Sequence, residues 1–205
     1  AIGYSALRYA DSGAAAVTYN TALGAYALRG STTAASNTGL YNTGVGHSAL
    51  YSMTSGGYNN AFGYGALYEN TTGAYNTALG HGALYSNVAK NYSTAVGYYA
   101  MYYADSGAAA TSYNTALGAY ALQGSTTAAS NTGTYNTAVG YQSLTAATSG
   151  GYNTAVGVDA LSDNTTGTNN TAVGYLALDT NVAKQESTAI GYSALRYADS
   201  GAAAV

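Results

Sequence analysis

The chain has no cysteine and no proline, and only 6% of its 205 residues are charged. Without cysteine there is neither a disulfide framework nor a thiolate metal site, so cysteine usage says nothing about the redox compartment. Without proline no strand loses a backbone donor, which is compatible with an uninterrupted hydrogen-bond ladder. The net charge of -3 leaves no basic patch, so nucleic acids and anionic membranes are disfavoured as partners.

Long apolar runs are missing as well. The longest are a few alanines and valines such as Ala14 to Val17, far shorter than the roughly 20 residues of a membrane-spanning helix. The hydrophobic content is nevertheless 47%, with 24 tyrosines, which is more apolar surface than disordered low-complexity segments usually carry. We therefore expect a folded chain with no membrane insertion in this segment.

What the chain does have is an internal repeat. Residues 1–17 recur letter for letter as residues 189–205, which predicts a window on a longer periodic array. A motif of the form Asn-Thr-Ala-apolar-Gly-x-x-Ala-Leu recurs, and its glycines are spaced 21, 22, 17, 17 and 17 residues apart in each set of 94 residues. The super-repeats cover residues 3–96 and 97–190, and a third begins at 191. The motif glycines are Gly3, Gly24, Gly46, Gly63, Gly80, Gly97, Gly118, Gly140, Gly157, Gly174 and Gly191.

One such unit is too small to bury a core alone, so the units are expected to stack as the coils of a solenoid. Alanine–leucine pairs favour helix, but a glycine in every unit, β-branched neighbours and Asn/Thr/Gly connectors oppose it. We predict an all-β fold over 1–205, a single continuous parallel β-solenoid of 17- to 22-residue coils. Within each coil, Asn-Thr-Ala-apolar is expected to form one strand and x-Ala-Leu-Tyr a second strand, with the glycine at the bend between them. Neighbouring coils are expected to pair as parallel strands about 4.8 Å apart.

Two apolar columns are predicted to form the core. The residue before each motif glycine is apolar, and the fourth residue after it is leucine or, once, methionine. Asparagines before the Thr-Ala pair are expected to hydrogen-bond from coil to coil as a ladder, with serine in their place at Ser93 and Ser187. The tyrosines beside them are expected to stack along the axis. The predicted core residues are Val45, Leu50, Phe62, Leu67, Leu79, Leu84, Val96, Met101, Val139, Leu144, Val156 and Leu161.

Residues 93–97 (Ser-Thr-Ala-Val-Gly) and 187–191 (Ser-Thr-Ala-Ile-Gly) resemble the head repeats of trimeric autotransporter adhesins. The longer form at residues 75–87 is similar to repeats of bacterial surface proteins and phage-type tail fibres, and the resemblance covers nearly the whole chain. It implies a left-handed β-roll, a homotrimer around one axis, display at the cell surface and adhesion to host or matrix ligands. A physical argument also favours a trimer. Each coil offers only two large apolar columns, so packing between chains would bury additional apolar surface.

An enzyme needs convergent, non-repeating polar groups, and the chain offers almost none, so we predict no catalytic activity, no cofactor and no metal. His47 and His81 share one column, where a tolerant surface position is expected rather than a metal site. Aspartates recur 94 residues apart in Tyr-Ala-Asp-Ser-Gly, which predicts an Asp-initiated turn, since one carboxylate lacks the oxygen ligands that calcium needs.

The longer connectors are the candidate recognition surface. Residues 8–18 and 29–40, with counterparts at 102–112 and 123–134, carry four or five extra residues, and solenoid insertions often collect on one face. Ordinary packed loops are the alternative. The candidate ligand contacts in these loops are Tyr9, Asp11, Tyr103, Asp105, Tyr197 and Asp199.

The sequence favours a structural function, as part of a long extracellular fibre or a surface adhesin shaft. Its main partner is then itself, as a homo-oligomer or filament, with a host surface, matrix or glycan as a further partner. A second hypothesis is a carbohydrate-binding solenoid that holds sugars with rows of tyrosine and asparagine. A third is ice binding by the threonine column that runs from Thr21 to Thr188 and is interrupted by Asn60.

Overall fold

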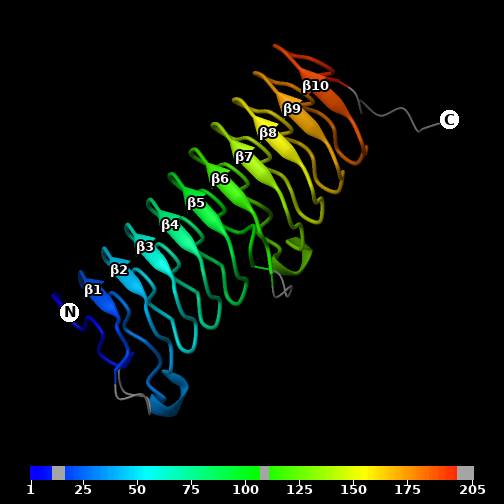
Figure 1. Cartoon of the computed structure of the whole chain (residues 1–205). Helices are drawn as coiled ribbons and strands as arrows, with labels where there is room; N and C mark the ends of the chain where they lie inside the picture. The colour runs from blue at the N-terminus through cyan, green and yellow to red at the C-terminus, as the bar shows by residue number, and fades with distance from the viewer. Residues whose placement is uncertain (11–16, 107–110, 198–205) are drawn as a thin grey trace.

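A computed structural model describes residues 1–10, 17–106 and 111–197 of the chain. Its strands are parallel and form one sheet in sequential order, one strand to each coil, and Figure 1 shows them in a line along one side of the stack. The predicted all-β parallel β-solenoid is therefore confirmed. The strands are β1 (Thr21–Leu23), β2 (Thr43–Val45), β3 (Asn60–Phe62), β4 (Thr77–Leu79), β5 (Thr94–Val96), β6 (Thr115–Leu117), β7 (Thr137–Val139), β8 (Thr154–Val156), β9 (Thr171–Val173) and β10 (Thr188–Ile190).

Successive strands pair with like residues in register. Ala78 in β4 lies opposite Ala95 in β5, and Leu79 lies opposite Val96. The same match of motif positions holds at all the other strand pairs, including those joined by the longer coils. Equivalent side chains therefore form straight columns along the axis, and ring stacking in these columns repeats every 4.8 to 5.1 Å.

The extra residues of the longest coils leave the stack sideways. Each of the two 22-residue steps carries a short 3-10 helix, η1 (Ala34–Ser36) in the first and η2 (Ala128–Ser130) in the second. Figure 1 shows both helices on the same edge of the solenoid, away from the strands. Within the described part of the chain, no helix is long and apolar enough to cross a membrane.

The motif glycine is required by both conformation and space. Gly63 has φ of 135°, and a Cβ added there would lie 2.5 Å from the carbonyl oxygen of Gly80 in the next coil. A φ in this range is strained for residues with a side chain, and real Cβ atoms do not approach backbone so closely. Glycine thus lets successive coils come close enough to hydrogen-bond.

The segment after the glycine is not the second strand that the sequence predicted. It forms consecutive turns, in which the second residue after the glycine and the leucine both take positive φ, for example Ser48 at 57° and Leu50 at 53°. The backbone still bonds from coil to coil, since Leu50 N–H donates to the Ala66 carbonyl at 3.0 Å. The bends turn the chain back on itself, so the coil closes without a flat second sheet.

Half of the predicted core is correct. The leucine column is fully buried at Leu50, Leu67, Leu84, Leu144 and Leu161, and Met101 takes the same place. Alanines from two columns pack against it, one column from the middle of each strand and the other from the position before the leucine. The small inner residues explain how a coil of 17 residues closes around one large apolar side chain, to which Met53 adds a second in the coil of Leu50.

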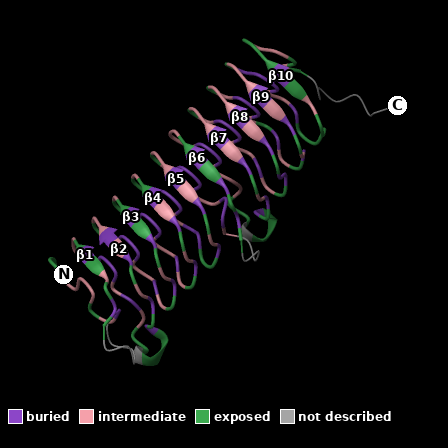
Figure 2. Cartoon of the chain, viewed as in Figure 1, coloured by how far each residue is buried: buried purple, intermediate pink, exposed green. Residues whose placement is uncertain are grey.

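The column before the glycine lies outside, so the prediction for its members is wrong. Successive side chains of a strand point to opposite faces, and the strands bury their central residue, which in β4 is Ala78. The flanking threonine and apolar residue then face outward, and Leu79 is 50% exposed. Figure 2 shows this alternation as purple next to pink and green along the chain. The corrected residues are Val45, Phe62, Leu79, Val96, Val139 and Val156, which are intermediate or exposed.

Candidate functional site

The interior carries the asparagine ladder that the sequence predicts. The backbone N–H of Asn76 donates to Oδ1 of Asn59 at 3.0 Å, and that of Ser93 donates to Oδ1 of Asn76 at 2.9 Å. The side-chain amide of Asn76 also donates to the carbonyl of Lys90 in its own coil at 2.9 Å. Each asparagine thus ties its strand to the connector of the same coil and to the next coil.

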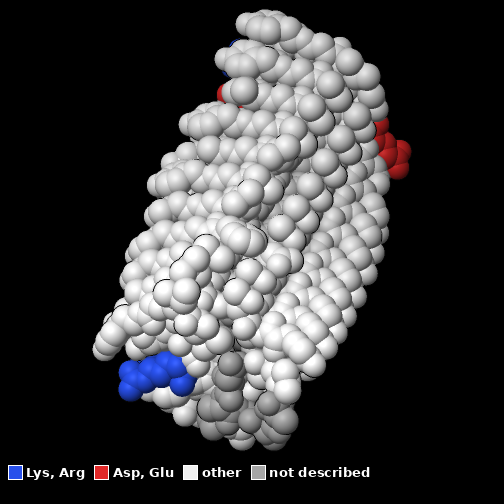
Figure 3. All heavy atoms as spheres, turned by 60° about the vertical axis from the view of Figure 1, so that its left-hand side comes forward, with Lys and Arg blue, Asp and Glu red and all other residues white. Residues whose placement is uncertain are grey.

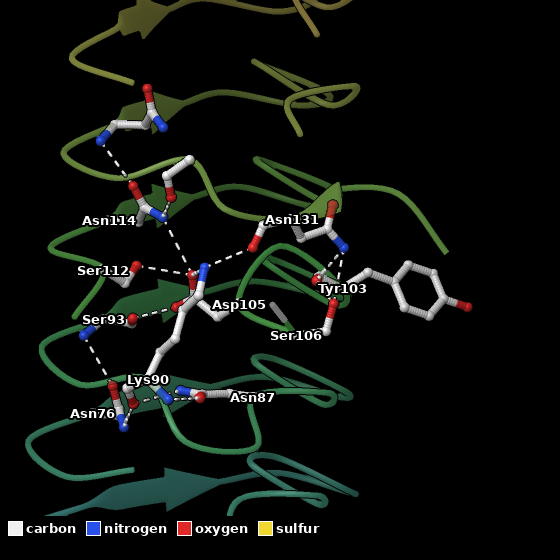
Figure 4. Close-up of polar contacts among 12 residues, drawn as sticks. Asn76, Asn87, Lys90, Ser93, Tyr103, Asp105, Ser106, Ser112, Asn114 and Asn131 are labelled. Carbon is white, nitrogen blue, oxygen red and sulfur yellow. Dashed lines mark hydrogen bonds and ion pairs between the residues drawn. The ribbon is translucent and has the colours of Figure 1, made fainter. Parts of the chain in front are cut away.

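The ladder is interrupted at Ser93, and Asp105 fills the gap. Figure 4 shows the carboxylate of Asp105 among Ser93, Ser112 and Asn114. It accepts hydrogen bonds from the Ser93 hydroxyl, from the Ser112 hydroxyl at 2.8 Å and from Nδ2 of Asn114 at 3.2 Å. Above it the ladder resumes, because the N–H of Asn136 donates to Oδ1 of Asn114 at 2.8 Å.

Lys90 brings a cation to the same place. Its Nζ lies 3.8 Å from Oδ1 of Asp105 and donates to the carbonyl of Asn131 at 2.8 Å. Both side chains of the pair are fully shielded from solvent, with 0% exposure. Burial lowers the pKa of Lys90, and the neighbouring Asp105 carboxylate acts in the opposite direction.

This buried cluster is sealed, so its role is structural. A buried charge is costly unless it is paired and hydrogen-bonded. Here three side chains donate hydrogen bonds to the carboxylate, and Lys90 forms an ion pair with it. Asp105 is 1% exposed and cannot reach an external ligand, so its predicted role as a ligand contact is wrong. The physical reason is the short side chain of Ser93, which leaves room for the aspartate inside the coil.

The other loop candidates lie nearer the surface. Asn131 donates to the Tyr103 carbonyl at 2.7 Å, and Figure 4 shows the Tyr103 ring pointing away from the buried cluster. Asn37 holds the Tyr9 carbonyl in the same way at 2.8 Å, and Tyr197 is 61% exposed. Their role as ligand contacts remains a prediction. Asp11 and Asp199 lie outside the described residues.

The column before the asparagines forms a continuous tyrosine ladder. Its neighbouring rings are 4.9 to 5.1 Å apart and nearly parallel, with interplanar angles of 2° to 17°. Each ring face is therefore covered by the next ring, and the edges and hydroxyls meet the solvent. A sugar cannot stack on the faces inside this ladder. Its members are Tyr19, Tyr41, Tyr58, Tyr75, Tyr92, Tyr113, Tyr135 and Tyr152.

A second aromatic ladder was not predicted. Tyr51, Tyr68, Tyr85 and Tyr102 follow the buried leucine or methionine in four consecutive coils, and their rings stack at 4.8 to 4.9 Å. The guanidinium of Arg29 lies 4.9 Å over the Tyr51 ring and extends this row by one more coil. Four tyrosines in one column of the sequence are the signal for this ladder, and a strand prediction for the segment does not use it.

The two histidines are separated by an aromatic ring. His47 stacks on Tyr64 at 5.1 Å, and Tyr64 stacks on His81 at 4.9 Å, so both imidazoles are part of a ring column. In the described ranges, no group of three or more His, Cys, Asp or Glu side chains is placed to hold a metal ion.

A shallow hollow of about 170 Å³ lies in the second super-repeat, between Gln142, Thr145, Ala146, Asp159, Ser162 and Asp163. Partial burial raises the pKa of Asp159, and repulsion from Asp179 adds to the effect. The hollow is small, and its polar lining consists of two carboxylates, the hydroxyls of Thr145 and Ser162 and the amide of Gln142.

Comparison with protein-family models, with curated proteins and with solved structures finds no match for this chain.

Proposed function

We propose that this chain is a segment of a stiff fibre or adhesin shaft that works outside the cell or on its surface. The observation that best supports this proposal is the unbroken register of the ten strands, in which each coil repeats the contacts of the last. A stack of this kind gains length without needing a separate core. Its low charge makes it relatively indifferent to salt.

The outer sheet face supports self-association. We define this face as the eight-tyrosine ladder, the threonine column, the apolar column before the glycine and the column after the glycine. Large apolar groups are exposed along it, including Leu79 at 50%, Leu117 at 49% and Tyr64 at 54%. These columns contain no lysine or arginine. Contiguous apolar surface of this kind marks an interaction site.

The outer sheet face is large enough to pack against other copies of the chain, and in a trimer each chain divides it between two neighbours. Ten strands spaced about 4.8 Å apart span roughly 43 Å, and six residue steps of about 3.3 Å give a width near 20 Å. The product is roughly 860 Å², close to the about 800 Å² that each partner contributes to a stable interface. We propose a homotrimer around a common axis, as the adhesin resemblance implies, with this face turned inward.

Sedimentation of the purified chain tests the proposal. We expect a trimer, and we expect L79K/L117K to sediment as a monomer because it places two cations in the apolar column. Val88→Lys is the matched control, since Val88 is 40% exposed but lies in a connector, and it should leave the trimer intact. A wild-type chain that stays monomeric at micromolar concentration would refute self-association.

Binding of host, matrix or glycan ligands is the attachment function that we propose for the finished fibre. A carbohydrate-binding solenoid is the second candidate, supported by the exposed edges and hydroxyls of the tyrosine ladders, where Tyr58 is 48% exposed. We propose no catalytic activity, because the paired ionisable groups Lys90 and Asp105 are sealed in the interior. A glycan array probed with the intact oligomer tests the second candidate, which loses its support if no glycan is retained.

A further inference from the structure

We propose that Arg8 and Arg29 form a binding site for one oxyanion group, a carboxylate or a sulfate ester, of an acidic polysaccharide. The two arginines lie in the first two coils, outside the outer sheet face. The proposal therefore goes beyond the shaft function and does not depend on self-association.

Both guanidinium groups lie beside the same tyrosine ring. The Cζ atoms of Arg8 and Arg29 lie 5.1 Å and 5.3 Å from the centroid of the Tyr9 ring. Arg29 also lies 4.9 Å over the Tyr51 ring and donates from Nη1 to the Tyr51 hydroxyl at 2.7 Å. These contacts fix the orientation of Arg29 before any ligand arrives, and a planar guanidinium matches the two oxygens of a carboxylate or sulfate.

The charge of this pair is not neutralised by other groups that the structure describes. Within residues 1–10, 17–106 and 111–197, the ion pairs are Lys90 with Asp105 and Arg196 with Asp179, and neither Arg8 nor Arg29 takes part in one. Figure 3 shows a compact basic patch near one end of a surface that is otherwise almost free of charge. The patch therefore produces a localised positive potential that attracts anions, and few other charged side chains on this surface weaken it.

The second super-repeat shows that the fold does not require the arginines. The positions equivalent to Arg8, Arg29 and Tyr51 are Tyr102, Gln123 and Thr145, and the coils close with the same buried leucine or methionine. In this column the second super-repeat carries no cation, and Arg196, the equivalent of Arg8 at the start of the third, is paired with Asp179. Arg8 and Arg29 are thus the two cations of the column that no described carboxylate neutralises, which suits them to recognition.

The surroundings favour a saccharide over a nucleic acid. Nucleic acids are held by neutralising many phosphates, and two cations are too few for that. From Arg29 the second ladder continues with Tyr51, Tyr68 and Tyr85, whose hydroxyls can donate to and accept from sugar hydroxyls. Burial raises the pKa of Tyr68 and of Tyr85, so these phenols stay neutral and do not repel an anion.

Isothermal titration of the full chain tests the site with three probes, a heparin-derived sulfated oligosaccharide, an oligogalacturonate and neutral dextran. We expect one site per chain for an acidic probe, weakened by added salt, and the stronger acidic probe identifies sulfate or carboxylate as the preferred group. R8Y/R29Q installs the residues of the second super-repeat and should lower the affinity at least tenfold with an unchanged circular dichroism spectrum. Unchanged affinity in this variant, or equal binding of dextran, would overturn the proposal.

A gain-of-function variant transfers the arginine site to the second super-repeat. Y102R/Q123R/T145Y copies the arginine site beside Tyr103, the equivalent of Tyr9, and should raise the stoichiometry from one site to two. A graft that folds but leaves the stoichiometry at one would contradict the assigned residues. Sedimentation of the same samples separates the two proposals, since R8Y/R29Q should lose the ligand and keep the oligomer, whereas L79K/L117K should lose the oligomer and keep the site.

Discussion

The hydroxyl of Ser93 donates a hydrogen bond to the carboxylate of Asp105 at the level where the asparagine ladder lacks a side chain. A serine in one coil and an aspartate from the following connector together replace one asparagine. Lys90 then balances the charge that this replacement brings into the interior. The three residues recur in the sequence as Lys184, Ser187 and Asp199, of which Asp199 lies outside the described residues.

The ion pair gives a test of stability. Lys90→Met leaves the Asp105 carboxylate buried without its cation and should lower the free energy of unfolding by about 3 kcal/mol or more. K90M/D105N removes both charges, keeps an amide for the serine and asparagine donors, and should recover most of the loss. Urea unfolding measures both, with Lys184→Met as a control because Lys184 is exposed. Equal effects of Lys90→Met and Lys184→Met would contradict the assigned role.

The corrected core predicts a contrast between two leucines of one coil. Leu84 is fully buried, so Leu84→Ala should cost about 2 to 5 kcal/mol through lost burial and the cavity left behind. Leu79 is 50% exposed in the single chain, and Leu79→Ala should cost about 1 kcal/mol or less. Denaturation at a dilution where the chain is monomeric compares them. A larger loss at Leu79 would mean that the apolar column before the glycine is buried after all.

Two glycines in one coil should respond differently to substitution. Gly63→Ala forces a Cβ against the Gly80 carbonyl at φ of 135° and should prevent the two coils from pairing. Gly65 has φ of 62°, a conformation that Ser48 adopts at the equivalent position, and a Cβ there would meet the Tyr85 ring at 3.2 Å rather than backbone. Gly65→Ser should therefore cost much less stability than Gly63→Ala. Thermal unfolding followed by circular dichroism distinguishes the two variants. A folded Gly63→Ala protein with an unchanged midpoint would contradict the close approach.

The second tyrosine ladder predicts an alkaline transition. Burial, and then the neighbouring Tyr85, raises the pKa of Tyr102 from 10.0 to about 12, and burial raises the pKa of Tyr68 and of Tyr85 as well. The folded chain holds these protons more tightly than the unfolded chain does. Their contribution to stability is therefore full below pH 10 and is lost as the pH rises toward 12. Phenolate absorbance should show a late phase that Tyr102→Phe reduces, and ionisation of all tyrosines near pH 10 would contradict it.

The solenoid, its parallel register and its asparagine ladder follow from the sequence because they depend on identity between units. Like residues recur at fixed positions, and stacking like on like satisfies the backbone and the amides together. Ala78 illustrates what was less visible, since a small residue in the middle of a strand occupies the inner face while its larger neighbour Leu79 faces out. Hydrophobicity alone would predict that Leu79 is more buried than Ala78, which is the reverse of what the structure shows.

The buried site was harder to predict for a different reason. Asp105 stands in a connector with turn chemistry, and its sequence neighbours give no sign that Ser93 leaves a gap for it. The pairing with Lys90 joins residues from consecutive coils, and only the closure of the longer connector brings them together. The turns at Leu50 and its equivalents were missed because a leucine with φ of 53° is rare and leaves no compositional mark.

The longer connectors change the local width of the solenoid but not its length. Each coil adds the same rise of about 4.8 Å whether the step has 17 or 22 residues, because the surplus projects sideways at η1 and η2. Duplicating one super-repeat would therefore lengthen the rod by a fixed increment of about 24 Å. Insertions at these two places would instead thicken it locally, so side loops can be added to such a solenoid without changing its length.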